Sequence, residues 1–75
     1  METKYICTVS FDDELNASVL IQKVVTIDGE EIRKNWRRAY AKGEPLGDSL
    51  PTTWGDLLWS DFNAERDYIL AKWAE

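Results

Sequence analysis

The side chains in this sequence that could perform chemistry are one thiol and two groups of carboxylates. Cys7 is the only cysteine, and the 75-residue chain contains no histidine. Since histidine is the commonest general base, the Cys7 thiol lacks its usual activating partner. Carboxylates that could do acid–base work stand at Asp12, Asp13 and Glu14 and at Asp61, Glu65 and Asp67. The residue types therefore favour a protein without enzymatic activity, in which Cys7 acts as a small buried apolar side chain.

The same residues predict no metal site and no cofactor. Zinc sites are built from cysteine and histidine, and one cysteine without any histidine leaves the usual patterns incomplete. The run from Asp12 to Glu14 lacks the alternating spacing and the glycine of an EF-hand loop. We expect this run to be a solvated loop.

Charge is distributed unevenly along a chain whose net charge is −5 and whose sequence pI is about 4.6. From Glu44 onward there are seven acids, and the only bases are Arg66 and Lys72. The preceding segment, residues 29–43, carries the basic side chains Arg33, Lys34, Arg37, Arg38 and Lys42. These could meet the phosphates of a nucleic acid. An acidic chain lacks the broad positive field that supports non-specific nucleic-acid affinity, so direct binding is the weaker alternative.

Two strands are predicted at the N-terminus. Residues 4–11 place Tyr5, Cys7, Val9 and Phe11 on one side, which is the period-two pattern of a half-buried strand. Residues 18–27 are rich in β-branched side chains and apolar on both faces, so they predict a second strand whose register is weakly specified. The two strands would form a hairpin. A short helix over residues 13–22 is the alternative.

A helix is predicted over residues 29–43. Ile32, Trp36 and Tyr40 recur at helical spacing together with Ala39. Asp28 can cap its N-terminus, and Gly43 suits the position after its last turn.

A second helix is predicted over residues 54–74, with Thr53 as its cap. Its core-facing sector would hold Leu58, Trp59, Phe62, Ile69, Leu70 and Trp73. The alternative is a break near residues 60–63, where Asn63 starts a new helix.

These elements predict one small α+β domain over residues 1–75, in which two helices pack on an N-terminal hairpin in the order β-β-α-α. No apolar run reaches the length of about 18 residues that a membrane span needs. We expect a cytoplasmic protein with no membrane contact.

Opposite its core sector, the second predicted helix would carry a ridge of Leu57, Asp61, Ala64 and Tyr68. Further residues of this face would be Trp54, Asp56, Glu65 and Asp67. Aromatic anchors carry much of the energy of protein interfaces, and charges steer the encounter. The pattern therefore predicts an interaction protein that docks this acidic and aromatic face onto a basic, nucleic-acid-binding site of a larger protein or protein–nucleic-acid complex.

Such docking would inhibit or modulate the partner. In size and acidity the chain resembles phage-encoded inhibitors of host or defence machinery, anti-CRISPR proteins among them, although no motif identifies a family. A structural or assembly role is a further alternative. In that case the strand from Val19 to Ile27 would pair edge to edge with other copies, and a homodimer is possible.

Overall fold

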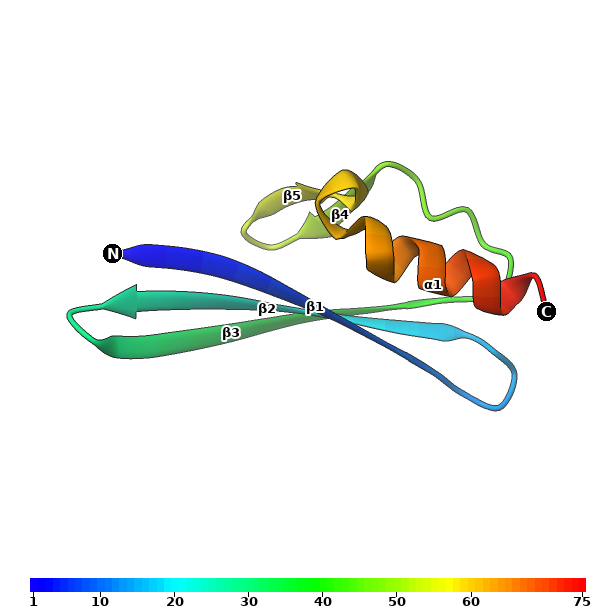
Figure 1. The fold of residues 1–75 in the computed structure, drawn as a ribbon, viewed down its shortest axis with the longest axis horizontal. Coiled ribbons are helices and arrows are strands. Elements are labelled where there is room, and N and C mark those ends of the chain that lie inside the picture. Colours follow the sequence, from blue (N-terminus) through cyan, green and yellow to red (C-terminus); the bar gives the residue numbers. More distant parts are fainter.

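A three-stranded antiparallel sheet forms the longer layer of the molecule (Figure 1). The computed structural model describes residues 1–75. Its first three strands are β1 (Glu2–Phe11), β2 (Ala17–Ile27) and β3 (Glu30–Tyr40), and β2 lies between the other two. The predicted N-terminal hairpin is confirmed, and the alternative of a helix over residues 13–22 is wrong. The predicted edge-to-edge assembly through the strand from Val19 to Ile27 is also wrong, because β2 is paired on both sides and has no free edge.

The loop between β1 and β2 is organised by Asp12. One oxygen of its carboxylate accepts the backbone N–H groups of Glu14 and Asn16, each at 2.9 Å, and the other oxygen accepts the Asn16 side-chain amide at 3.0 Å. Leu15 adopts a positive φ of 65° within this loop. The chain can therefore reverse and bring Phe11 opposite Ala17.

The predicted helix over residues 29–43 is wrong, because most of this segment is strand β3. Asp28 and Gly29 form a two-residue turn with φ angles of 51° and 82°, and they bring Glu30 opposite Ile27. Two consecutive positive φ angles are the signature of the type I′ hairpin turn that Asp-Gly favours. The helical spacing was ambiguous, since residues 32, 36 and 40 are separated by even numbers and also share one face of a strand.

The predicted helix over residues 54–74 is replaced by three shorter elements after a second hairpin. Strands β4 (Ser49–Thr52) and β5 (Gly55–Leu58) pair antiparallel. A short 3-10 helix, η1 (Trp59–Phe62), leads into α1 (Asn63–Trp73). The alternative in which Asn63 starts a new helix is confirmed, and the predicted cap at Thr53 is wrong because the chain there turns between strands.

The C-terminal elements form a second layer on one face of the sheet (Figure 1). The predicted β-β-α-α arrangement is therefore wrong: the chain forms a three-stranded sheet, then a small hairpin, and then a single α-helix at the C-terminal end. No helix has the length and apolar character that a membrane span requires.

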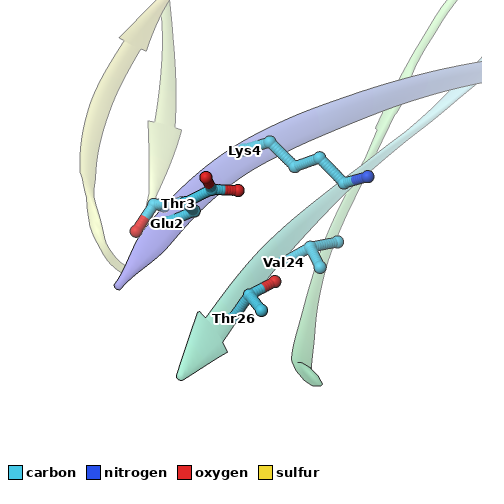
Figure 2. A pocket seen from close by; sticks show the side chains of 5 residues that line it. All are labelled: Glu2, Thr3, Lys4, Val24 and Thr26. Carbon is cyan, nitrogen blue, oxygen red and sulfur yellow. The ribbon is translucent and has the colours of Figure 1, made fainter. Parts of the chain in front are cut away.

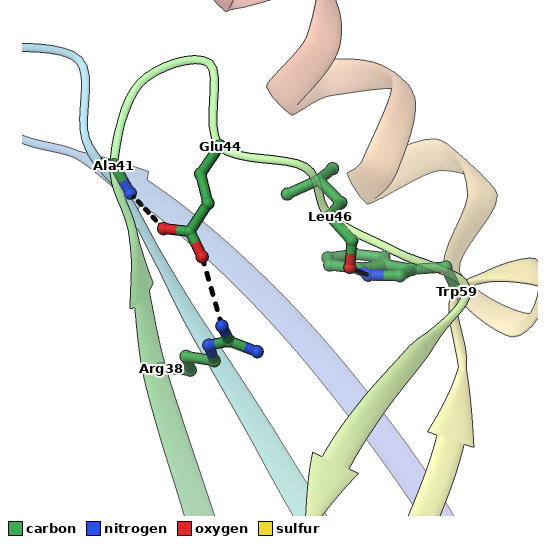
Figure 3. A network of polar contacts seen from close by, with 5 residues as sticks. All are labelled: Arg38, Ala41, Glu44, Leu46 and Trp59. Carbon is green, nitrogen blue, oxygen red and sulfur yellow. Dashed lines mark hydrogen bonds and ion pairs between the residues drawn. The ribbon is translucent and has the colours of Figure 1, made fainter.

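The core lies between the two layers. It combines three residues of β2 with one of β3 and five of the C-terminal half: Ala17, Val19, Ile21, Tyr40, Leu46, Leu50, Trp59, Phe62 and Ile69. Trp59 is fully buried, and its indole N–H donates to the Leu46 carbonyl at 3.1 Å (Figure 3). The second layer is thereby fixed to the loop that follows β3.

The second layer covers only part of the sheet. The molecule measures 45 × 23 × 20 Å, and the turn between β2 and β3 extends away from α1 (Figure 1). Near this turn Ile27 is 42% exposed and Ile32 is 49% exposed. The sheet thus has one covered end and one open end.

Candidate partner-binding surface

The residues predicted to form one acidic helix face are distributed over four kinds of structure: a turn, a strand, a 3-10 helix and an α-helix. Trp54 lies in the turn between β4 and β5, where its ring centre is 6.4 Å from that of Tyr5 on β1. Asp56 and Leu57 belong to β5, and Asp61 belongs to η1. Only Ala64, Glu65, Asp67 and Tyr68 lie on α1. The predicted ridge from Leu57 to Tyr68 does not form.

Three of the predicted contact residues are half-buried, and one of them is Trp54, which packs against the core. Leu57 is half-buried and packs against the core. Glu65 is also half-buried, and its charge adds to the effect of burial on Cys7. Burial and Glu65 together raise the pKa of the Cys7 thiol to about 12, so the thiol remains protonated at neutral pH. Cys7 packs against the core as a partly buried side chain, as the strand pattern predicted.

The remaining acidic residues lie on the outside of the second layer. Asp56, Asp61 and Asp67 are exposed, and Tyr68 is 52% exposed, with its ring edge against Phe11 at 5.4 Å between centres. The three carboxylates take part in none of the ion pairs of the structure. Their negative charge is therefore presented to the solvent.

Sequence reasoning missed two apolar members of this surface. Leu58 is 51% exposed and Leu70 is 45% exposed, although both were predicted to face the core. Leu58 alternates with Leu57 along β5, so one side chain packs inward and the next points outward. Leu70 follows the fully buried Ile69 on α1 and lies three residues after Asp67, which makes Asp67 and Leu70 neighbours on the helix surface.

We call the exposed acidic and large apolar residues of the second layer, taken together, the outer surface: Asp56, Leu58, Asp61, Asp67, Tyr68 and Leu70. Tyr68 and Leu70 are two residues apart on α1 and so project from opposite flanks of the helix. Asp56 and Leu58 share one side of β5, because side chains two apart on a strand point the same way. The outer surface combines uncompensated carboxylates with large exposed apolar side chains.

The basic residues predicted to contact nucleic acid do not form one patch. Val19 and Ile21 face the core, and they lie opposite Arg38 and Trp36 of β3. Arg38 and Lys34 therefore project from the face of the sheet on which the second layer packs, whereas Arg33 and Arg37 project from the opposite face. Because β3 is a strand, consecutive basic side chains project from opposite faces of the sheet.

Two of these cations are already engaged within the chain. The Arg33 guanidinium lies 3.0 Å from the Glu31 carboxylate. The Arg38 guanidinium lies 3.1 Å from the Glu44 carboxylate (Figure 3). It also lies 4.4 Å from the centre of the Tyr40 ring. Glu44 also accepts the backbone N–H of Ala41 at 3.0 Å, so Arg38 helps to hold the loop after β3.

Lys42 lies in that loop, beyond the end of β3. Its backbone N–H donates to the Asn16 side chain at 3.1 Å, which ties the loop to the turn between β1 and β2. Lys42 is therefore separated from Arg33 by most of the length of β3.

A hollow of about 340 Å³ lies at the other end of the sheet (Figure 2). Its walls come from the start of β1 and the end of β2, with one apolar side chain among them: Glu2, Thr3, Lys4, Val24 and Thr26. No three potential metal ligands converge anywhere in the structure. The hollow has one acid and one base and none of the clustered carboxylates discussed above.

Comparison with known protein families, curated proteins and solved structures finds no match for this chain. Surface chemistry is therefore what points to its function.

Proposed function

We propose that the protein is a small interaction module that docks its outer surface onto a basic site of a larger protein and thereby inhibits or modulates it. The observation that carries the proposal is the coexistence of unpaired carboxylates and exposed large apolar side chains on one layer. Asp61 and Asp67 supply charge, whereas Leu58, Tyr68 and Leu70 supply apolar area.

The two kinds of side chain have complementary roles at an interface. Desolvated aromatic and aliphatic anchors provide most of the binding energy, while charges accelerate the encounter and select the partner. Tyr68 is suited to anchoring, because its contact with Phe11 restrains the ring while half of the side chain stays accessible. Carboxylates form charge-assisted hydrogen bonds with the same arginine and lysine groups that hold phosphates. The favoured partner is therefore a protein with a basic, nucleic-acid-binding site.

The basic residues of the sheet are less suited to binding a partner than the outer surface is. Arg33 and Arg38 are each paired with an acid of the same chain, and they project from opposite faces. A phosphate backbone would therefore meet few free cations on either face of the sheet. The net charge of −5 also opposes binding of a nucleic acid.

The test compares proteins captured by the tagged full chain from the cells that produce it. The test variant is Asp61→Lys/Asp67→Lys. The matched control is Asp13→Lys/Glu14→Lys, which makes the same change of net charge at exposed positions between β1 and β2.

We expect the wild type and the control to retain the same partner, and duplex DNA to displace it by competing for its basic site. The Asp61→Lys/Asp67→Lys variant should lose at least about tenfold in affinity, in line with the size of electrostatic steering effects. Equal retention by both variants would exclude the outer surface as the docking site.

A further inference from the structure

The two outer strands of the sheet differ in how their free edges are protected. Both β1 and β3 pair with β2 on one side only. An unpaired strand edge is a template for another strand, and proteins usually block it with charged side chains. β3 carries Arg33, Lys34, Arg37 and Arg38 along its length. In β1 no charged side chain occurs between Tyr5 and Phe11, and the strand has no proline and no glycine.

The register shows which backbone groups of β1 are free. The N–H of Asp12 donates to the Asn16 carbonyl at 3.2 Å, so these two residues form a hydrogen-bonded pair at the end of the hairpin. Hydrogen-bonded pairs recur at every second residue of an antiparallel ladder. Residues 4, 6, 8 and 10 therefore bond to β2, and residues 3, 5, 7 and 9 direct their N–H and C=O groups to the free edge.

We propose that two copies of the chain pair through these edges, with their β1 strands antiparallel and Ile6 on the two-fold axis. The two sheets then become one six-stranded sheet. In this register Tyr5 lies opposite Cys7 of the second copy, and Thr3 lies opposite Val9. Each of these pairs exchanges backbone hydrogen bonds, so the free groups of both edges are satisfied.

Charge disfavours one of the two neighbouring registers, the one with Cys7 on the axis, and the cross-link at Ile6 described below tests the other. With Ile6 on the axis, Lys4 lies opposite Thr8 and Glu2 lies opposite Ser10, and no like charges meet. A shift that places Cys7 on the axis brings Glu2 opposite Asp12, which is unfavourable for two carboxylates. The β3 edge is excluded for a similar reason, because an antiparallel pair of β3 strands brings arginine and lysine side chains together.

The shape of the molecule also favours a second copy of the chain as the partner that pairs with the free edge of β1. The second layer covers only one end of each sheet (Figure 1). Antiparallel pairing places the covered end of one copy beside the open end of the other, on the same face of the continuous sheet. Tyr5, which is 36% exposed, then has the partner's layer beside it. Surface that the single chain leaves uncovered is thereby sheltered.

Mass measurement and cysteine cross-linking test the dimer independently of the proposed function. The full chain should show a concentration-dependent dimer mass by light scattering. In a Cys7→Ala background, Ile6→Cys should form a disulfide-linked dimer under mild oxidation. Ile6 is a non-hydrogen-bonded position on the axis, where the two Cα atoms lie about 4.5 Å apart, within the range that a disulfide spans.

Thr8→Cys in the same background is the matched control. Two Thr8 residues would be displaced by four positions along the strands, roughly 13 Å, which is too far for a disulfide. Ile6→Lys should give a folded monomer, because it places two like charges on the axis. A strictly monomeric wild type, a dimer that survives Ile6→Lys, or cross-linking of Thr8→Cys in preference to Ile6→Cys would each overturn the proposal.

Discussion

The two layers of the molecule treat their charges differently. In the sheet and the loop that follows it, Arg33 is neutralised by Glu31 and Arg38 by Glu44. In the second layer the only ion pair joins Lys72 and Glu75 at the C-terminal end. Exposed ion pairs contribute little stability, so their presence in the sheet says more about surface potential than about folding. Two arginines of β3 are thus paired with acids of the same chain, whereas Asp56, Asp61 and Asp67 of the second layer take part in no ion pair.

The layers also differ in how they depend on each other. The sheet is held by long antiparallel ladders over ten or more residues per strand. The second layer has only two four-residue strands, η1 and an eleven-residue helix. Isolated two-stranded hairpins and short helices are marginal in water. The outer surface can therefore keep its shape only while the second layer stays packed on the sheet.

The largest predicted effect comes from removing the side chain that joins the layers. Trp59→Ala should lower the free energy of unfolding by about 3–5 kcal/mol, because it deletes a fully buried indole and its bond to Leu46. Urea denaturation measures the change. Ile32→Ala, at a position that is 49% exposed on the open end, serves as the control and should cost less than about 0.5 kcal/mol. Similar losses for both variants would show that the layers are not joined through Trp59.

A smaller effect on the free energy of unfolding should appear at high pH, and it comes from Cys7, which lies between the two layers. The pKa of Cys7 is raised from its ordinary value of 9.0 to about 12, chiefly by burial and then by Glu65 of α1. Because the folded state favours the protonated thiol, the contribution of Cys7 to stability is complete below about pH 9 and is lost as pH rises toward 12. The stability difference between the wild type and Cys7→Ala should shift against the wild type over this interval. A difference that stays constant with pH would place Cys7 in contact with water.

The smallest effect is expected within the sheet, at the loop that Asp12 organises. Hydrogen bonds from Asn16 are the main cause of the lowered pKa of Asp12. The ionised carboxylate therefore stabilises the folded state above its ordinary titration range, and this contribution is lost as pH falls through the lowered pKa. Asp12→Asn should be less stable than the wild type at neutral pH and should lose that disadvantage in acid. NMR titration of Asp12 measures the shift directly, and an ordinary pKa would contradict the loop geometry.

Sequence reasoning recovered the first hairpin and missed the third strand, for an identifiable reason. Period-two patterning specifies β1 through Cys7, Val9 and Phe11. In β3 the helical spacing of the apolar residues coincides with strand alternation, and Asp28-Gly29 serves equally well as a helix start or a hairpin turn. What decides between them is pairing with β2, a long-range contact that local propensity does not contain.

The structure leaves only some of the residues that were predicted for the contact surface exposed. Asp56, Asp61, Asp67 and Tyr68 are exposed, as predicted for a contact surface. The assignment of Leu57 and Glu65 depended on one continuous helix, and it failed when Gly55, with φ at 109°, proved to start a strand. The assumption of one continuous helix also led to the wrong prediction that Leu58 and Leu70 face the core.

Mapping the contact by NMR shows whether the partner binds the outer surface. An isotope-labelled chain is titrated with the captured partner, and the backbone amide shifts are followed at low and high salt. The largest shifts should lie on β5, η1 and α1, around Leu58, Asp61 and Asp67, and high salt should weaken them. Shifts centred on β3 between Arg33 and Arg38, with the second layer unchanged, would contradict docking through the outer surface.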